Sequence, residues 1–463
     1  MSQLARIGAS ESRLATYFEE WMSSTAKFRV SRIKYAAASS IGSKVVTILV
    51  QLLAMPVAIR ALGAQEFALY ALLASAIGWV GLVNLGVGPA LSVSMASAVA
   101  NNDRTVQARL CSSGFFPVLG VVVALGGILL SLAQTPRVDG LFGENYLAQA
   151  DTIRTGLSLL LVFALAQALL SVAEAAQIGY QEQYVFNIWA IFGNLVSLFA
   201  LFATAWRSPT VIAMILAVNL PPLLARLLNA ARFLSRRPFL IPRISTFSWQ
   251  AGRFLIGNGL IFSLAASVGN FLNHQYTVIL VGRAESTQIT TTFAVMMNVF
   301  ILAFGLVTML AIPLWPAIAD SVTRGEIDWA HLAYRKMLLY SMLYSLAVCL
   351  GLILFGPIAF PIWFSADVNP NSRLLLLAGV YFVLDTWEYV HFMVLIGLKQ
   401  IWRPSVLYLL RSLMAVLIAP ALIGRFGESG AFAALSFSIL MTTAWAMPYF
   451  VRSVFKWTGQ TVT

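Results

Sequence analysis

The chain has 463 residues, of which 59% are hydrophobic and only 10% are charged. Soluble domains carry about 25% charged residues, so a soluble globular fold is excluded. A net charge of +12 would suggest a nucleic-acid partner in a soluble protein, but in so apolar a chain the basic residues are expected to act as membrane-topology signals.

Apolar runs long enough to cross the roughly 30 Å hydrocarbon layer recur along the whole chain. Because no run alternates with a period of two residues, the runs are predicted to be helices and not the strands of a barrel. The sequence therefore predicts an all-α polytopic membrane protein with about twelve spans. The predicted spans are 36–59, 66–92, 112–133, 155–177, 184–205, 209–230, 253–281, 290–313, 337–362, 373–396, 405–424 and 429–450.

The charge distribution predicts two halves with both termini in the cytoplasm. If the N-terminus is cytoplasmic, twenty of the 30 basic residues fall on that side, seven on the other and three within spans, which is a strong positive-inside bias. Each half enters the membrane in the same direction, which suits a parallel repeat with a substrate path between the halves. The predicted parts are a cytoplasmic arm (1–35), a six-helix bundle (36–230), a basic linker (231–252), a second six-helix bundle (253–450) and a cytoplasmic tail (451–463).

The segments between the spans are short and carry no enzyme motif. The sequence has no GxxxxGK[ST] phosphate loop, no HExxH motif and no nucleophile elbow. This pattern favours a secondary transporter, a flippase or a channel over an enzyme. A membrane glycosyltransferase or O-antigen ligase would need longer loops, and we expect no cofactor and no metal, apart from a possible coupling H⁺ or Na⁺.

The first span carries a polar stripe that includes a lysine. Ser40, Lys44, Thr47 and Gln51 follow one another at steps of four, three and four, so they share one helix face. A charge at mid-depth costs about 2.5–3.5 kcal/mol on insertion scales, which makes Lys44 a functional candidate. The alternative is that Lys44 snorkels to the interface about 12 Å away. We expect the stripe to face a wet cavity.

The seventh span repeats the pattern with Ser263, Ser267, Asn270, His274 and Thr277. Two stripes at equivalent places in the two halves indicate a central hydrophilic chamber. The alternative is hydrogen bonding between helices of one bundle, which is worth about 0.6 kcal/mol per contact.

The tenth span places Asp385, Glu388 and His391 at intervals of three. Arg411 on the eleventh span falls at a depth similar to that of Glu388, so a structural pair Glu388–Arg411 is predicted. Asp385 is then the candidate for coupling transport to an ion. Glu174 and Arg226 lie nearer the inner ends of their spans and are expected at the interface.

Three stretches resemble the polysaccharide flippases of the multidrug/oligosaccharidyl-lipid/polysaccharide exporter superfamily. They are ALGAQEFALYALLASAIGWVGLVNLGVGPAL (Ala61–Leu91), AEAAQIGYQEQYVFNIW (Ala173–Trp189) and IPLWPAIADSVTRGEIDWAHLAYRK (Ile312–Lys336). They come in the expected order, and a break between six and six spans is similar to that family's organisation.

The resemblance implies a V-shaped pair of six-helix bundles in the bacterial inner membrane. It implies alternating access, by which an undecaprenyl-pyrophosphate-linked oligosaccharide crosses from the cytoplasmic to the periplasmic leaflet for O-antigen and lipopolysaccharide synthesis. Glycosyltransferases and a polymerase are the implied partners. A multidrug exporter of the same superfamily is the alternative, since it also has twelve spans.

The polar residues suit such a substrate in an electropositive cavity. Sugar hydroxyls match neutral polar side chains, and a pyrophosphate matches a basic one. We expect Lys44 first and Arg60 second to bind the pyrophosphate, with His274 as a further donor if it is protonated. The expected sugar contacts are Ser40, Thr47, Gln51, Ser267 and Asn270.

Overall fold

The computed structural model describes residues 42–43, 45–76, 86–136, 142, 144–311, 318, 321–322, 325–365, 368–398, 400 and 402–460. This described part is helical and contains no strand. Ten of its helices are long and apolar enough to cross a membrane. The prediction of an all-α polytopic membrane protein is therefore confirmed.

The N-terminal half begins with the helical segment Val45–Ala76. Its 32 residues would extend roughly 48 Å as one straight helix, more than a bilayer needs. Gly63 interrupts the segment with φ of +76°, in the left-handed region that glycine tolerates, at the place where the sequence predicts the turn between the first two spans. The half continues with α2 (Val87–Ala100), α3 (Arg104–Ala133), the 3₁₀ turn η2 (Glu144–Gln149), α5 (Ala150–Gly179), α6 (Gln183–Arg207) and α7 (Val211–Ser235).

The predicted linker forms two short 3₁₀ turns, η3 (Pro238–Leu240) and η4 (Ile244–Thr246). The seventh predicted span is interrupted: α8 (Trp249–Asn270) and α9 (Tyr276–Ala284) are joined by the π-helical turn η5 (Phe271–Gln275). The twelfth predicted span also divides, at Thr442. The remaining helices are α10 (Thr287–Ala311), α12 (Ile327–Trp363), α13 (Ser372–Gly397), α14 (Trp402–Phe426), α15 (Glu428–Met441) and α16 (Thr443–Gln460).

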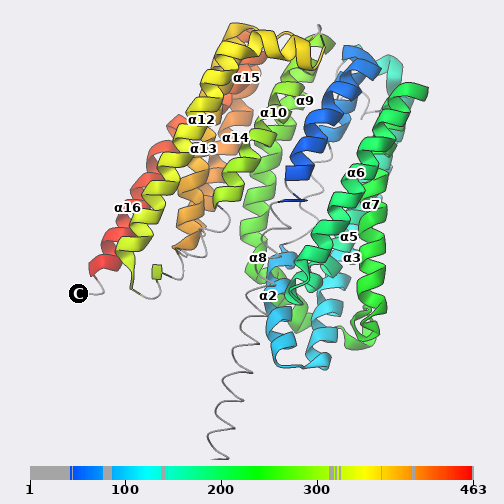
Figure 1. Cartoon of the computed structure of the whole chain (residues 1–463), viewed down its shortest axis with the longest axis vertical. Coiled ribbons are helices and arrows are strands. Elements are labelled where there is room, and N and C mark those ends of the chain that lie inside the picture. The colour runs from blue at the N-terminus through cyan, green and yellow to red at the C-terminus, as the bar shows by residue number, and fades with distance from the viewer. Residues whose placement is uncertain are drawn as a thin grey trace, which may run out of the picture.

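The helices form two groups, one made by the N-terminal half and one by α9–α16 (Figure 1). We call the end where α3 begins and α7 ends the basic end, because Arg104, Arg109, Arg232 and Arg236 lie there. The two groups lie close together at the other end and diverge toward the basic end, which is at the bottom of Figure 1. The molecule therefore has the shape of a V that opens at the basic end.

Helix α8 belongs to both groups. It packs on α2 and α3 near its start and on α14 further along. Gly252 lies against the Ser113 carbonyl, where a Cβ would come within 3.2 Å, and Gly269 leaves no space for a Cβ beside the ring of Tyr408. These two glycines allow α8 to approach first one half and then the other, so it crosses the open side of the V.

Candidate functional site

A cavity of about 400 Å³ lies within the C-terminal half. We call it the C-half cavity. It is bounded by α8, η5, α10, α13 and α14, and one side of it is apolar, with Ile301, Phe304 and Phe392 among the lining residues. Its polar lining residues are Ser267, Asn270, His274, Asp385, Glu388, Tyr389 and Tyr408.

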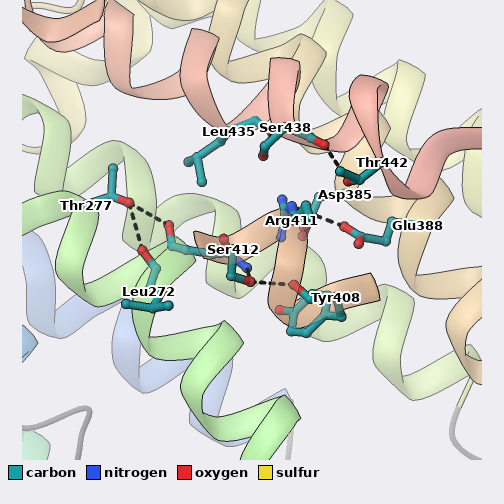
Figure 2. Close-up of polar contacts among 11 residues, drawn as sticks. Leu272, Thr277, Asp385, Glu388, Tyr408, Arg411, Ser412, Leu435, Ser438 and Thr442 are labelled. Carbon is teal, nitrogen blue, oxygen red and sulfur yellow. Dashed lines mark hydrogen bonds and ion pairs between the residues drawn. The ribbon is translucent and has the colours of Figure 1, made fainter. Parts of the chain in front are cut away.

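Two of the lining residues, Asp385 and Glu388, belong to a buried charge cluster around Arg411, which Figure 2 shows. Arg411 on α14 is fully buried, and its Nη2 lies 3.3 Å from Oδ1 of Asp385. Its Nε lies 3.5 Å from Oε2 of Glu388, so the two residues predicted to pair are brought together. The guanidinium also lies 5.9 Å from the ring centre of Tyr381 and 5.6 Å from that of Tyr408.

Asp385 also contacts the guanidinium of Arg411, and this contact was not predicted from the sequence. The reason is helical geometry: residues three apart on α13 share a face, so one arginine reaches both carboxylates. His391 does not join them. Each step of three residues turns the face by about 60°, and His391 instead contacts the Tyr334 hydroxyl at 2.9 Å and the Trp387 carbonyl at 2.7 Å.

The cluster contains two acidic side chains for one basic side chain. When both carboxylates are ionised, the group carries an excess negative charge in a dry environment, which is costly. A proton or a small cation entering from the C-half cavity would neutralise it. Binding of an ion at these carboxylates would therefore change the ion pairs that join α13 to α14.

The polar stripe of the seventh span is divided between two environments. Ser267, Asn270 and His274 line the C-half cavity. Thr277 instead donates to the carbonyls of Leu272 and Asn273 at 3.1 and 3.0 Å, and Asn273 donates to Ser412 at 2.9 Å. The π-helical turn, which contains both Asn273 and His274, shifts the register, and such turns are frequent at functional sites. The sequence pattern did not indicate it, and the side chain of Ser263 lies outside the described residues.

The polar stripe of the first span is described only in part. Ser40 and Lys44 lie outside the described residues. Thr47 donates to the Ser43 carbonyl at 2.8 Å and accepts from the Asn194 amide on α6 at 2.9 Å, so it takes part in packing within the N-terminal half. Gln51 is exposed.

Arg60 lies at the closed end of the V, away from the C-half cavity. Its guanidinium donates to the last carbonyls of α12 and the residue that follows, those of Ile362 at 2.7 Å, Trp363 at 3.2 Å and Phe364 at 2.8 Å. In return the Trp363 indole donates to the Leu52 carbonyl at 3.3 Å. A helix C-terminus attracts cations, so Arg60 closes this end by bridging the two halves.

A second bridge strengthens the same closure. The Thr291 hydroxyl at the start of α10 donates to the Ala64 carbonyl at 2.5 Å. Further along, Gly282 packs so closely on Leu72 that a Cβ would lie 2.6 Å away. We call these contacts, together with those of Arg60 and Trp363, the closing contacts. They account for the convergence of the two halves at this end.

The N-terminal half has its own charged pair. Arg226 on α7 lies 3.6 Å from Glu174 on α5 and donates to Gln167 at 3.1 Å. The two side chains are 30% and 14% exposed, and their expected place near the interface stays a prediction.

These features define a multi-pass membrane protein of two helical bundles, closed at one end and holding a polar cavity. No protein-family model matches the chain. A protein of Yersinia pseudotuberculosis described as a candidate O-antigen export protein is 22% identical over 437 residues, which cover 90% of this chain and 95% of that protein.

Solved structures show the same fold. The inward-facing conformation of a multidrug resistance MATE family transporter of the MOP superfamily superposes with a TM-score of 0.71 and 15% identity, over 90% of this chain and 96% of that one. The eukaryotic MATE transporter AtDTX14 superposes with a TM-score of 0.67 and 11% identity, over 94% and 99%. The chain has the fold of the MOP-superfamily transporters, and the resemblance found in the sequence is confirmed.

Proposed function

We propose that the chain is a flippase that moves an undecaprenyl-pyrophosphate-linked oligosaccharide from the cytoplasmic to the periplasmic leaflet of the bacterial inner membrane. The observation that carries this proposal is the match, over nearly the whole of both chains, to a candidate O-antigen export protein. The transported unit would serve surface polysaccharide synthesis. Glycosyltransferases would supply it and a polymerase would use it, while the chain itself performs no covalent chemistry.

The V shape supports an alternating-access mechanism. If the basic end is cytoplasmic, as the positive-inside bias predicts, the described state is open to the cytoplasm and closed to the periplasm. Opening toward the periplasm then requires the closing contacts to break and new contacts to form at the basic end. Arg60 would act in this mechanism by stabilising the closed end, instead of binding the pyrophosphate as the sequence suggested.

Within this proposal the polar residues have separate roles. Ser267 and Asn270 in the C-half cavity suit sugar hydroxyls, since each offers neutral donors and acceptors. Lys44 stays the predicted partner of the pyrophosphate. Asp385, on the wall of the C-half cavity, is the proposed carrier of the coupling H⁺ or Na⁺.

One observation favours a second candidate function. Two carboxylates line the C-half cavity among aromatic side chains, which suits a cationic amphiphile. A cation-coupled multidrug exporter would use such a cavity, as the fold also allows.

Deletion of the gene distinguishes the two functions. A flippase deletion should abolish surface polysaccharide and leave lipid-linked units whose sugars stay on the cytoplasmic face, with drug susceptibility unchanged. Lys44→Ala, produced at normal level, should fail to complement, whereas Lys336→Ala on α12 should complement. Normal polysaccharide with drug hypersensitivity would instead establish the exporter, and full complementation by Lys44→Ala would remove Lys44 from the substrate path.

A further inference from the structure

A second hollow, with a volume of about 490 Å³, lies at the basic end between α6 and α7. We call it the basic-end pocket. Aliphatic and aromatic side chains form much of its wall, including Ile188, Trp189 and Phe192 of α6 and Phe233 of α7. Three arginines of the α7 terminus, Arg232, Arg236 and Arg237, also line it. An apolar pocket with a basic rim at this end of the molecule suits a ligand that is itself amphipathic.

One of the three arginines is already bound within the protein. Arg237 makes a 2.6 Å ion pair with Glu182, and its guanidinium lies 4.3 Å from the ring centre of Tyr180 and 4.7 Å from that of Phe233. Glu182 is the only acidic residue among those that line the pocket, and this pair neutralises it. Arg237 is therefore part of the wall.

The other two arginines face solvent. Arg232 lies in the last turn of α7 and Arg236 directly follows the helix. Both are exposed, and neither side chain has a hydrogen-bond or ion-pair partner in the part of the chain that the structure describes. The neutral amides beneath them are occupied, because Gln177 and Asn229 bond each other at 2.7 and 3.2 Å. The available charged donors of the pocket are thus the two guanidinium groups at its rim.

Next to the basic-end pocket, the exposed surfaces of α6 and α7 are apolar along the length of both helices. Ile188 and Phe199 on α6 are 57% and 72% exposed, and Leu224 and Leu228 on α7 are also exposed. This row runs toward the membrane interior, since it follows the helices away from the basic end. An acyl chain lying along it would reach the pocket with its polar end.

The pocket faces away from the space between the halves. Phe192 and Asn194 are two residues apart on α6 and so point about 200° apart. Asn194 contacts Thr47 of the helical segment Val45–Ala76, and that segment makes the closing contacts with the C-terminal half. The α6 face with Phe192 is therefore on the lipid side, and none of the pocket's residues lines the C-half cavity.

We propose that the basic-end pocket binds the phosphate headgroup of an anionic membrane phospholipid. Arg232 and Arg236 donate to the phosphate oxygens, a geometry that guanidinium groups serve well, and the acyl chains lie along α6 and α7. Basic pockets between membrane helices on the cytoplasmic side take such headgroups. The site is separate from the proposed transport path and does not depend on the flippase proposal.

Lipid binding to the delipidated full-length protein in detergent tests this site by native mass spectrometry. The wild type should bind phosphatidylglycerol about tenfold more tightly than zwitterionic phosphatidylethanolamine, from roughly 1 kcal/mol per basic residue and some screening. Arg232→Ala/Arg236→Ala should lose that preference. Arg243→Ala, which removes an exposed arginine of the same linker that does not line the pocket, should keep it.

Three results would overturn the proposal. The first is equal binding of the two phospholipids by the wild type, and the second is an unchanged preference in the double alanine variant. The third is tighter binding of undecaprenyl phosphate than of phosphatidylglycerol at this site, which would identify the occupant as the transport lipid. Arg232→Lys/Arg236→Lys preserves the charge, so a folded lysine variant that retains part of the preference supports the site even if the alanine variant is unstable.

Discussion

The two halves of the molecule each contain an arginine paired with a carboxylate of another helix, but the arginine is partly exposed in one half and fully buried in the other. In the N-terminal half, the Arg226 and Glu174 side chains are 30% and 14% exposed and lie 3.6 Å apart. In the C-terminal half, Arg411 is 0% exposed and its partners Asp385 and Glu388 are 10% and 2% exposed. The same chemical groups are therefore expected to contribute differently to the stability of the two halves.

The difference also concerns charge balance. The N-terminal pair is one to one, so its charges cancel, and its arginine is partly exposed. The C-terminal cluster has one more carboxylate than guanidinium, and little water reaches it. A buried charge without a partner is costly, whereas a partly exposed one is not. We infer that the C-terminal cluster both stabilises its half and responds to cations, and that the N-terminal pair does neither to the same extent.

Removing Arg411 should have the largest effect. Arg411→Ala leaves two buried carboxylates without a cation, a change that costs about 3–5 kcal/mol in buried pairs. We expect a large fall in thermal unfolding temperature in detergent and in the amount of folded protein. Arg403→Ala on the same helix, where the side chain is exposed, is the matched control and should keep the wild-type melting temperature.

Replacing all three charged residues of the cluster with neutral ones gives a second test of this prediction. Arg411→Met combined with Asp385→Asn and Glu388→Gln removes all three charges, so most of the stability lost in Arg411→Ala should return. Failure of Arg411→Ala to lower the melting temperature would show that the cluster does not stabilise the bundle.

Removing Arg226 should have a much smaller effect. Arg226→Ala leaves a single carboxylate, Glu174, without its arginine, whereas Arg411→Ala leaves two, and the Arg226 guanidinium is itself partly exposed. The melting temperature should therefore stay within a few degrees of the wild type, measured beside Arg411→Ala in the same detergent. A loss as large as that of Arg411→Ala would mean that the two halves do not differ as described.

Much of this contrast could be predicted from the sequence. The spans follow from the lengths of apolar runs, and the meeting of Glu388 with Arg411 follows from their equal depth on adjacent helices. The sharing of Arg411 by Asp385 was not predicted. The three-residue spacing places both acids on one face of α13, but the reach of the Arg411 side chain depends on how the helices pack. The π-helical turn at Phe271–Gln275 and the contacts of Arg60 with α12 were missed for the same reason, since both depend on the approach of helices far apart in the sequence. The role of Lys44 stays a prediction.

Replacing Asp385 should have the smallest effect on stability and a specific effect on transport. Asp385→Asn leaves Arg411 with Glu388, so the cluster becomes balanced and the melting temperature should not fall. Because the surplus carboxylate is gone, the variant should lose any acceleration of transport by a proton or sodium gradient. Vesicles that report sugar exposure to a lectin measure this response with and without each gradient.

Glu388→Gln is the matched control for this last prediction, because it also leaves one carboxylate for one guanidinium. Asp385 is the more accessible of the two, at 10% against 2%, and an exchanging ion has to reach its site through the C-half cavity. Glu388→Gln should therefore retain the gradient response. If only Glu388→Gln abolishes the response, the coupling role belongs to Glu388; if neither variant changes it, the excess negative charge of the C-terminal cluster has no part in driving transport.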